Sequence, residues 1–353
     1  MEAIEPYLLA LAEGDATALH LRAKDRPFWR VEGELIPNGD PLPAGGAFDA
    51  MLDELTRLGR VDAWARDRDT EFVAASGGAR FLVRLSRTSD GPSALLVRLT
   101  DPGPDAERLR IPEPAVRSVL GPPGLVLVMS GRDGGKSSSL AALLSSAACK
   151  SQRYILALQA PASLAIESGR SVVHAFQVGH DVPSHAAGVA MAIGLGADVI
   201  GIDELADAEC ASLALEAADG GACVVAAMHA HSLISGLDRF VALLRGPSER
   251  RLRGMLAQAL RFAMHQTLVP SKQGRLVPAA EWLCGVRVAN DMLRAGKEAE
   301  IPALFHGARV AGLRSFDDSL EELVRSHDLD RDEALRRAQN RSRFEQKTAG
   351  ASA

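Results

Sequence analysis

This chain of 353 residues has few aromatic residues, few cysteines and no long uninterrupted hydrophobic run. Aromatic residues make up 4% of it, which disfavours an all-β protein and favours a helix-rich α/β fold. The four cysteines form no C-x-x-C pair, so neither a zinc ribbon nor a disulfide framework is indicated. We therefore expect reduced thiols in or near a core at Cys149, Cys210, Cys223 and Cys284.

The lack of a long apolar run argues against a membrane-spanning helix. The most apolar stretch, residues 186–202, is interrupted by Asp198 and divides better into a helix and a strand. The first fifteen residues are acidic and too short in apolar length for a signal peptide. The net charge of −5 disfavours a nucleic-acid-binding protein. We expect a cytoplasmic protein, and docking on a membrane protein stays open.

The sequence changes character three times along the chain. Residues 1–100 alternate polar and apolar in short runs around one helical stretch, which predicts a small α+β domain with an antiparallel sheet. Residues 101–123 hold six prolines and indicate a linker. From 124 to 270, apolar strand-like runs alternate with helical stretches, as in a parallel sheet with crossover helices. Residues 271–347 are expected to be mainly helical.

Individual elements can be placed within these regions. The pattern turns helical after Leu244, with an amphipathic helix pair over residues 315–339, and residues 347–353 are expected to be disordered. A helix is predicted over residues 47–59. Strands are predicted at residues 18–23, 27–37, 70–76, 79–87 and 93–100, and then at 125–129, 154–158, 198–202 and 223–228.

A glycine-rich loop follows the predicted strand in the segment GLVLVMSGRDGGKSSSLAALL, Gly124 to Leu144. Such a loop turns its backbone N–H groups onto phosphates, while a Lys reaches the β/γ oxygens and a Ser or Thr holds Mg²⁺. The spacing G-x-x-x-x-G-K-[ST] places Ser130 where the first Gly is expected, so either Ser130 replaces it or the loop is one residue short. The candidate nucleotide-binding residues are Ser130, Gly131, Gly134, Gly135, Lys136, Ser137 and Ser138.

Two later strands end in polar residues. The segment ADVIGIDELAD ends a strand in Asp203 and Glu204, and CVVAAMHAH ends another in His229. Carboxyl ends of strands in open α/β sheets are where ligands bind. We therefore expect these residues to face the glycine-rich loop, with a solvated turn and a structural histidine as the alternatives.

These segments together resemble one family, the PilT-type ATPases of type IV pilus retraction, within the secretion-ATPase superfamily. The resemblance runs from about Asp15 to Arg337, and it aligns the glycine-rich loop without a gap, which selects Ser130 as the substitute for the first Gly. ADVIGIDELADAECASLALEAADGGACVVAAMHAH is similar to the acidic and histidine motifs of the family. LVP, at Leu268 to Pro270, and MLRAGK, at Met292 to Lys297, match later family segments.

The resemblance implies a RecA-like P-loop NTPase domain after a small PAS-like domain, with a C-terminal helical region. It implies ATP and Mg²⁺ as cofactors, a hexameric ring or a mixed ring with a PilT-type paralogue, and a platform protein of the inner membrane as partner. The chain would then be cytoplasmic or peripheral at that membrane. Lys136 and Ser137 would hold phosphate and Mg²⁺, Glu204 would activate water, and His229 would sense the γ-phosphate. Arg80 and Arg98 are the candidates for the arginines that reach the phosphates from the first domain.

The chain also departs from the family pattern. Gln159 and Ala160 stand where the family has two acids, and neither can serve as a base. Asp133 replaces a glycine of the phosphate loop, and a carboxylate there would repel a triphosphate. Ala190 and Gly194 replace two arginines of a family helix. Conversely, Asp203 replaces a family Gly, so Mg²⁺ coordination is expected to shift to Asp203.

Two functions follow from these matches and departures. The first is an active motor that hydrolyses ATP to drive pilus retraction or a related secretion machine. The second is a degenerate paralogue, weakly active or inactive, that serves as an accessory or regulatory subunit of a genuine motor. The scattered cysteines argue against a type II secretion assembly ATPase, which usually carries a tetracysteine zinc insert. Acidic net charge argues against a RecA-like nucleic-acid motor, and no nucleic acid is expected as a partner.

Overall fold

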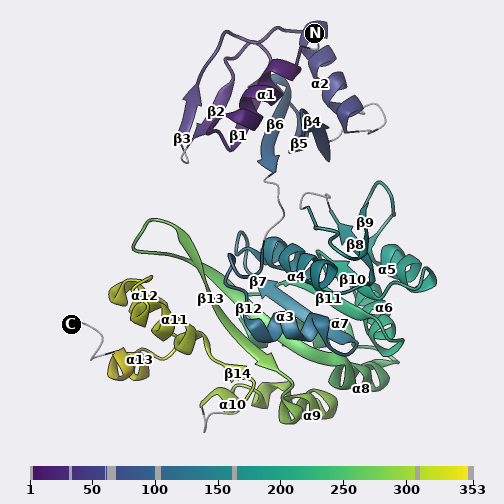
Figure 1. The fold of residues 1–353 in the computed structure, drawn as a ribbon, viewed down its shortest axis with the longest axis vertical. Helices are drawn as coiled ribbons and strands as arrows, with labels where there is room; N and C mark the ends of the chain where they lie inside the picture. Colours follow the sequence, from purple (N-terminus) through teal and green to yellow (C-terminus); the bar gives the residue numbers. More distant parts are fainter. Residues whose placement is uncertain are drawn as a thin grey trace. The chain divides into compact units, whose positions relative to one another are not determined.

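The computed structural model describes residues 3–31, 34–59, 61, 69–99, 105–160, 165–306 and 311–348 (Figure 1). The chain separates into two compact units. The first comprises Met1–Pro102 with Ala160–Ala165, and the second comprises Gly103–Gln159 with Ile166–Ala353. In the described residues, no helix is both long and apolar enough to cross a membrane.

In its described residues, the first unit is an antiparallel sheet with two helices. Its strand order is β3-β2-β1-β6-β5-β4, and every pairing is antiparallel. One face of this sheet packs on the core of the unit. On β5, for example, Phe81, Val83 and Leu85 are buried and alternate with residues that are not fully buried. The elements are α1 (Glu5–Glu13), β1 (Ala18–Arg22), β2 (Phe28–Val31), β3 (Glu34–Pro37), α2 (Gly46–Leu58), β4 (Thr70–Ser76), β5 (Ala79–Thr88) and β6 (Gly91–Leu99).

The strands and the helix predicted for the first hundred residues are confirmed, with two differences. The run over residues 27–37 is the hairpin of β2 and β3 rather than one strand. Helix α1 was not predicted, and its Leu8 and Leu11 are buried in the core of the unit.

The second unit is built on an eight-stranded sheet in the order β14-β13-β12-β7-β11-β10-β8-β9. The pairings from β12 to β9 are parallel, as expected, and those of β13 are antiparallel. The strands are β7 (Gly124–Ser130), β8 (Tyr154–Gln159), β9 (Val172–Gln177), β10 (Val199–Ile202), β11 (Cys223–His229), β12 (Leu260–Pro270), β13 (Leu276–Cys284) and β14 (Leu313–Arg314).

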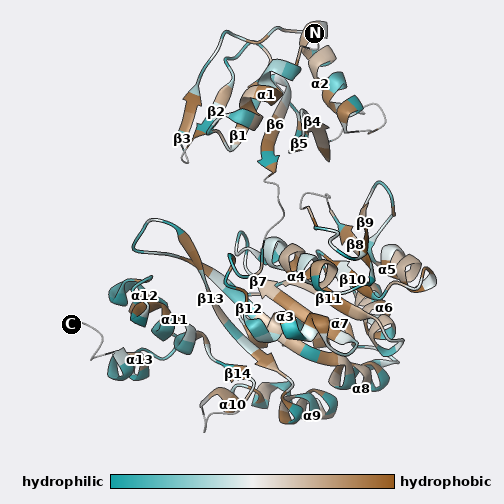
Figure 2. Ribbon diagram, viewed as in Figure 1, coloured by the Kyte–Doolittle hydropathy of each residue, from teal (hydrophilic) through white to brown (hydrophobic). Residues whose placement is uncertain are grey.

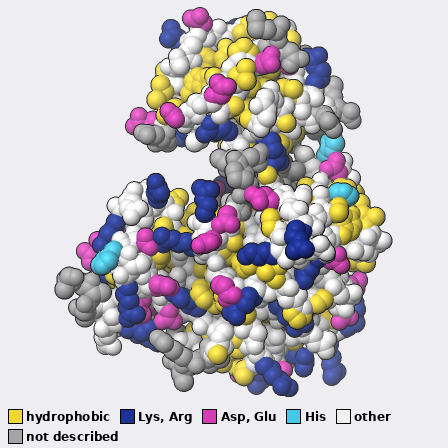
Figure 3. Space-filling model, viewed as in Figure 1, with side chains coloured by type: hydrophobic (Ala, Val, Ile, Leu, Met, Phe, Trp, Pro, Cys, Tyr) yellow, Lys and Arg dark blue, Asp and Glu magenta, His cyan; other side chains and the backbone are white. Residues whose placement is uncertain are grey.

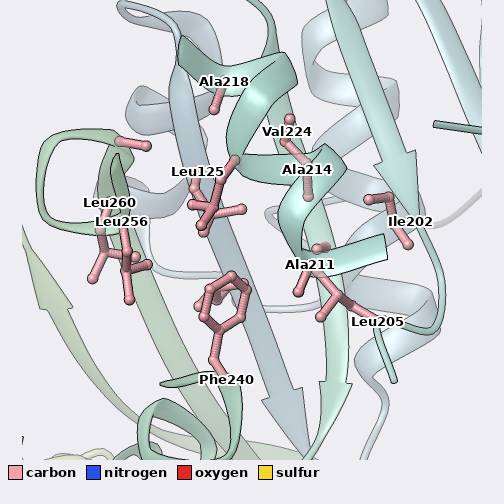
Figure 4. Close-up of a cluster of buried hydrophobic side chains, with 14 of the residues drawn as sticks. Leu125, Ile202, Leu205, Ala211, Ala214, Ala218, Val224, Phe240, Leu256 and Leu260 are labelled. Carbon is pink, nitrogen blue, oxygen red and sulfur yellow. The ribbon is translucent and has the colours of Figure 1, made fainter. Parts of the chain in front are cut away.

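Helices cover both faces of this sheet (Figure 1). On strand β7, Val126 and Val128 pack with α3 and α4, whereas Leu125, Leu127 and Met129 join the cluster of the opposite face, which Figure 4 shows with the alanines of α6. Both faces are therefore apolar, which explains the continuous hydrophobic strands. The helices are α3 (Glu113–Leu120), α4 (Lys136–Lys150), α5 (His185–Gly194), α6 (Ala208–Asp219), α7 (Leu233–Leu243), α8 (Glu249–Ala259), α9 (Arg287–Ala295), η1 (Glu298–Glu300), α10 (Ala303–His306), α11 (Phe316–Arg325), α12 (Arg331–Arg337) and α13 (Arg341–Thr348).

The expectation of helix from Leu244 to the end is wrong over residues 260–284, which form the hairpin of β12 and β13. This hairpin also crosses residue 270, where the helical region was expected to begin. The signal is weak because His265, Gln266 and Thr267 interrupt the apolar run of β12. The predicted helix pair is confirmed as α11 and α12, whose ribbons in Figure 2 carry mainly hydrophilic colours. Residues 349–353 lie outside the described part.

The expected proline-rich linker contains helix α3. The prolines do not prevent it, because Pro112 is the N-cap and Pro114 lies in the first turn, where a missing N–H costs nothing. Ala115 and Val119 are fully buried against the sheet and α4. A linker pattern therefore concealed an element of the second unit's core.

Candidate functional site

The candidate residues lie at one edge of the eight-stranded sheet. Across β11, β7 and β12, the strand register aligns His229, Ser130 and Gln266 in one row. On the other side of β11, strand β10 ends at Ile202, so Asp203 follows at the same edge. The parallel sheet therefore brings the glycine-rich loop, the acidic segment and His229 together, as the sequence predicted.

The glycine-rich loop connects β7 to α4 through a tightly turned backbone. Ser130 is fully buried, its hydroxyl donates to the carbonyl of Gly131 at 2.9 Å, and its own carbonyl accepts from Ala230 N at 3.1 Å. Gly135 is the N-cap of α4 and has a left-handed φ of 83°. Asp133 also has a positive φ, 55°, a conformation that carries a steric cost for a residue with a side chain.

The glycines of this loop differ in how much space surrounds them. A Cβ at Gly134 would lie 2.7 Å from Ser130 Cβ, and one at Gly135 would lie 2.9 Å from Gln266 Nε2. A Cβ at Gly131 would meet nothing within 4 Å. Gly134 and Gly135 therefore permit close packing of the loop on β7 and β12, whereas Gly131 does not face a neighbour.

The N-terminus of α4 is suited to an anion. No side chain within the described ranges caps it, and the first turn contains Lys136, Ser137 and Ser138. The Lys136 ammonium makes no hydrogen bond or ion pair with any described residue, and Ser137 is exposed. Unpaired N–H groups, the positive end of the helix dipole and a nearby ammonium together attract phosphate.

The acidic segment after β10 places its two carboxylates differently. Asp203 N donates to Leu158 O at 3.1 Å, and Asp203 Oδ1 lies 2.6 Å from Nε2 of His185 in the first turn of α5. Both of these side chains are about 15% exposed. The half-buried Glu204 carboxylate forms no hydrogen bond or ion pair with the residues that the structure describes. Glu204 is therefore available to a ligand, whereas Asp203 has a protein partner.

Strand β8 ends in Gln159, next to β10 and 5% exposed, with Ala160 after it. Positions 159 and 160 therefore lack the two carboxylates that the family pattern has at these positions.

Nearby on α6, burial and then Asp207 and Asp203 raise the pKa of Cys210 to about 12, which keeps its thiol protonated. All four cysteines are free thiols, as predicted.

His229 ends β11, and its ring contacts His231 edge to face, with centroids 5.4 Å apart. Its carbonyl accepts from an Arg239 guanidinium N–H at 3.2 Å. The backbone is thus fixed where the histidine leaves the sheet, while the ring stays half-buried at the edge.

The two candidate arginines, Arg80 and Arg98, lie on adjacent strands of the first unit. Arg98 Nη1 donates to the carbonyls of Ala12, at 2.9 Å, and Gly14, at 2.7 Å, at the C-terminal end of α1. Arg98 therefore caps that helix. Arg80 lies on β5, in register with Leu99 of β6, and is half-buried.

Two residues of this edge were not found from the sequence. His185 is 18 positions from Asp203, and Gln266 is 132 positions from Gly134, so only the folded sheet shows these contacts. The one available signal was that polar residues interrupt the otherwise apolar β12.

The parallel sheet, the glycine-rich loop and the acidic strand end define a P-loop type of α/β protein. The chain belongs to the type II/IV secretion system protein family, whose model matches residues 110–346. It is 28% identical over 337 residues to the type IV pilus retraction ATPase PilT of Pseudomonas aeruginosa, covering 95% of this chain and 98% of that protein. It is 25% identical to the type IV pilus ATPase PilU of the same organism, covering 95% and 88%.

A solved structure of the pilus retraction motor PilT with bound ADP has the same fold. It superposes with a TM-score of 0.84 at 21% identity, covering 98% of this chain and 99% of that chain. The predicted family membership and α/β fold are confirmed.

Proposed function

We propose that this chain is a PilT-like ATPase that binds ATP with Mg²⁺ at the glycine-rich loop and hydrolyses it to drive retraction of a type IV pilus or a related secretion machine. The observation that carries the proposal is the uncapped start of α4, where Lys136 has no partner among the described residues. The resemblance to PilT and PilU supports the choice of machine.

The residues present fit a nucleotide and a magnesium ion. Loop N–H groups and Lys136 would hold the phosphates, and close packing at Gly134 and Gly135 keeps side chains out of the turn. Mg²⁺ binds through one or two carboxylates together with substrate phosphates. Ser137 and Asp203 would provide one hydroxyl and one carboxylate of this set. When bound, Mg²⁺ neutralises charge on the phosphates.

Glu204 would orient the attacking water and accept its proton, because its carboxylate lies at the same strand edge without a protein partner among the described residues. His229 would donate to the terminal phosphate from the end of β11. Arg80 and Arg98 are the cations that the first unit would contribute, and Arg98 also donates to the carbonyls of Ala12 and Gly14 at the end of α1. Charge placed around the phosphates lowers the barrier only if it is fixed in advance.

The assembly belongs to the same proposal. We infer a ring, most simply a hexamer, or a mixed ring with a PilT-type paralogue, located in the cytoplasm or at the inner membrane with a platform protein as partner.

On the face in Figure 3, basic and acidic side chains are interspersed rather than separated by sign. Among the described residues, this face therefore carries no single-sign patch of the kind expected of a nucleic-acid motor.

The test is steady-state ATP turnover with Mg²⁺, together with ATP affinity, for the natural protein and its Lys136→Ala and Glu204→Gln variants. The proposal expects turnover that both variants abolish, with binding lost only in Lys136→Ala. Binding without turnover in the natural protein would instead support an accessory subunit of another motor. Unchanged binding in Lys136→Ala would overturn the assigned site.

A further inference from the structure

The side chain of Gln266 joins the glycine-rich loop to the helix that follows it. Gln266 Nε2 donates to the carbonyl of Gly134 at 2.7 Å, and its Oε1 accepts from the Ser139 hydroxyl at 2.8 Å. The side chain reaches this position from β12 and is 5% exposed. One buried amide therefore holds two points of the chain on either side of residues 135–138.

The chemistry of the contacts fixes the orientation of this amide. The carbonyl of Gly134 can only accept, so it requires the NH₂ group, and the hydroxyl of Ser139 can then donate to the remaining oxygen. A carboxylate could replace only the second contact, and an apolar side chain could replace neither. Because all of these groups are buried or half-buried, an unmatched partner would be costly.

The amide also occupies the space that the loop leaves open. A Cβ on Gly135 would lie 2.9 Å from Gln266 Nε2, and Gly135 already requires its left-handed φ of 83°. The turn before α4 is therefore shaped around Gln266 as well as around β7.

Strand β12 itself is firmly placed. It pairs with β7 on one side and with β13 on the other. On its partner β13, Glu281 Oε1 accepts from the backbone N–H of Leu233 at the start of α7 and lies 3.3 Å from Nδ1 of the adjacent His265, without a hydrogen bond to it. Gln266 thus extends from a strand that is anchored on both sides.

We propose that Gln266 is a positioning residue for nucleotide binding. It holds the carbonyl of Gly134 away from the anion site and sets the first turn of α4, so that the loop N–H groups and Lys136 converge before the phosphates arrive. Gln266 makes no contact with the nucleotide in this proposal, which rests on the ATP-binding function inferred above. Pre-organisation of this kind strengthens binding because less ordering remains to be done.

The experiment compares Gln266→Leu and Gln266→Glu with Thr267→Val, a matched control on the same strand whose hydroxyl bonds no described residue. ATP affinity, KM and kcat are measured with Mg²⁺, and Tm is measured with and without ATP. We expect Gln266→Leu to raise Kd and KM for ATP about tenfold, the loss expected from about one buried hydrogen bond. We expect kcat to change less than KM, and the shift in Tm on adding ATP to shrink. Thr267→Val should behave like the natural protein.

A purely structural role would give a different result. It would lower Tm without ATP and reduce kcat through the active fraction, with KM unchanged, and that outcome overturns the proposal. If Gln266→Leu does not fold, Gln266→Glu and Ser139→Ala replace it, since each retains part of the contact. The proposal would also be overturned if Lys136→Ala lost ATP binding while Gln266→Glu and Ser139→Ala bound ATP with the affinity of the natural protein. Absence of ATP binding in the natural protein would contradict the proposed function instead.

Discussion

The two halves of the candidate site are built in different ways. The phosphate half, formed by the loop between β7 and α4 and by Gln266, relies on backbone groups held by a buried amide. The acid half, at the ends of β8 and β10, relies on individual side chains. There Gln159 occupies a position that the family pattern gives to an acid, and Asp203 is paired with His185.

On the proposed function, this difference assigns ATP binding and hydrolysis to separate parts of the sheet edge. The loop keeps its contacts with β12 although Asp133 has a positive φ, whereas Gln159 lacks the carboxylate that the family pattern has at its position. Substitutions in the phosphate half should therefore act on affinity, and substitutions in the acid half should act on turnover or on the metal.

The largest effect is expected at Glu204. Glu204→Gln keeps the shape of the side chain but removes the base, so kcat should fall by about 10²–10⁴ while ATP affinity is retained. Glu209→Gln is the matched control. It makes the same chemical change at Glu209, which is exposed in the first turn of α6. An equal loss of affinity in Glu204→Gln would break the division between the two halves.

The next effect is expected at Gly134. Gly134→Ala would place a Cβ 2.7 Å from Ser130 Cβ, so we expect weaker ATP binding and a loss of about 1–3 kcal/mol in the free energy of unfolding. Gly131→Ala is the control for stability, since its Cβ would meet nothing within 4 Å. Chemical denaturation of both variants and ATP titration of Gly134→Ala provide the measurement, and an equal loss of stability in both would contradict the packing argument.

A smaller effect is expected at Asp203. Asp203→Asn should reduce ATP affinity about tenfold in the presence of Mg²⁺, which corresponds to ~1.4 kcal/mol, and should leave affinity in EDTA unchanged. His185→Leu separates metal binding from structure, because it removes the contact between the His185 ring and Asp203 and leaves the carboxylate. If affinity with Mg²⁺ were unaffected by Asp203→Asn, coordination would not have shifted to this residue.

The smallest effect is expected at Asp133. Asp133→Gly relieves the positive φ and removes a negative charge near the phosphates, so ATP affinity should rise by a few-fold. Asp133→Asn isolates the charge, because Asn tolerates the same backbone conformation. A higher affinity in the Gly variant alone would attribute the effect to the backbone, and no gain in either would show that Asp133 faces away from the ligand.

Local patterns predicted most of the fold, because the buried strands of the parallel sheet are apolar on both faces. The same rule explains the failures. Strand β12 was missed because His265 and Gln266 are polar residues at buried positions, and the contact that Gln266 makes with Gly134 lies far away in sequence. Helix α3 was hidden by prolines that fall where a helix accepts them.

The site was predicted to a similar degree. The loop and the acidic strand end could be found because the spacing of a phosphate loop is itself a local pattern, as with Lys136. The contacts of His185 with Asp203, and of Arg98 with α1, depend on register and tertiary packing, which no short segment encodes. The residues proposed to perform chemistry therefore lie in local patterns, whereas the residues that contact them do not.

The β12–β13 hairpin determines where this chain can be divided. Its pairs run from Phe262 with Cys284 to Pro270 with Leu276, so a cut after Pro270 would remove the partner of a central strand. The bared N–H and C=O groups of β12 would then form a long open edge, a template for intermolecular pairing and aggregation. Truncation at that point should give insoluble protein. The hairpin therefore joins the sheet and the segment after Pro270 into one folding unit, which neither gene fusion nor proteolysis at this point can divide into two stable parts.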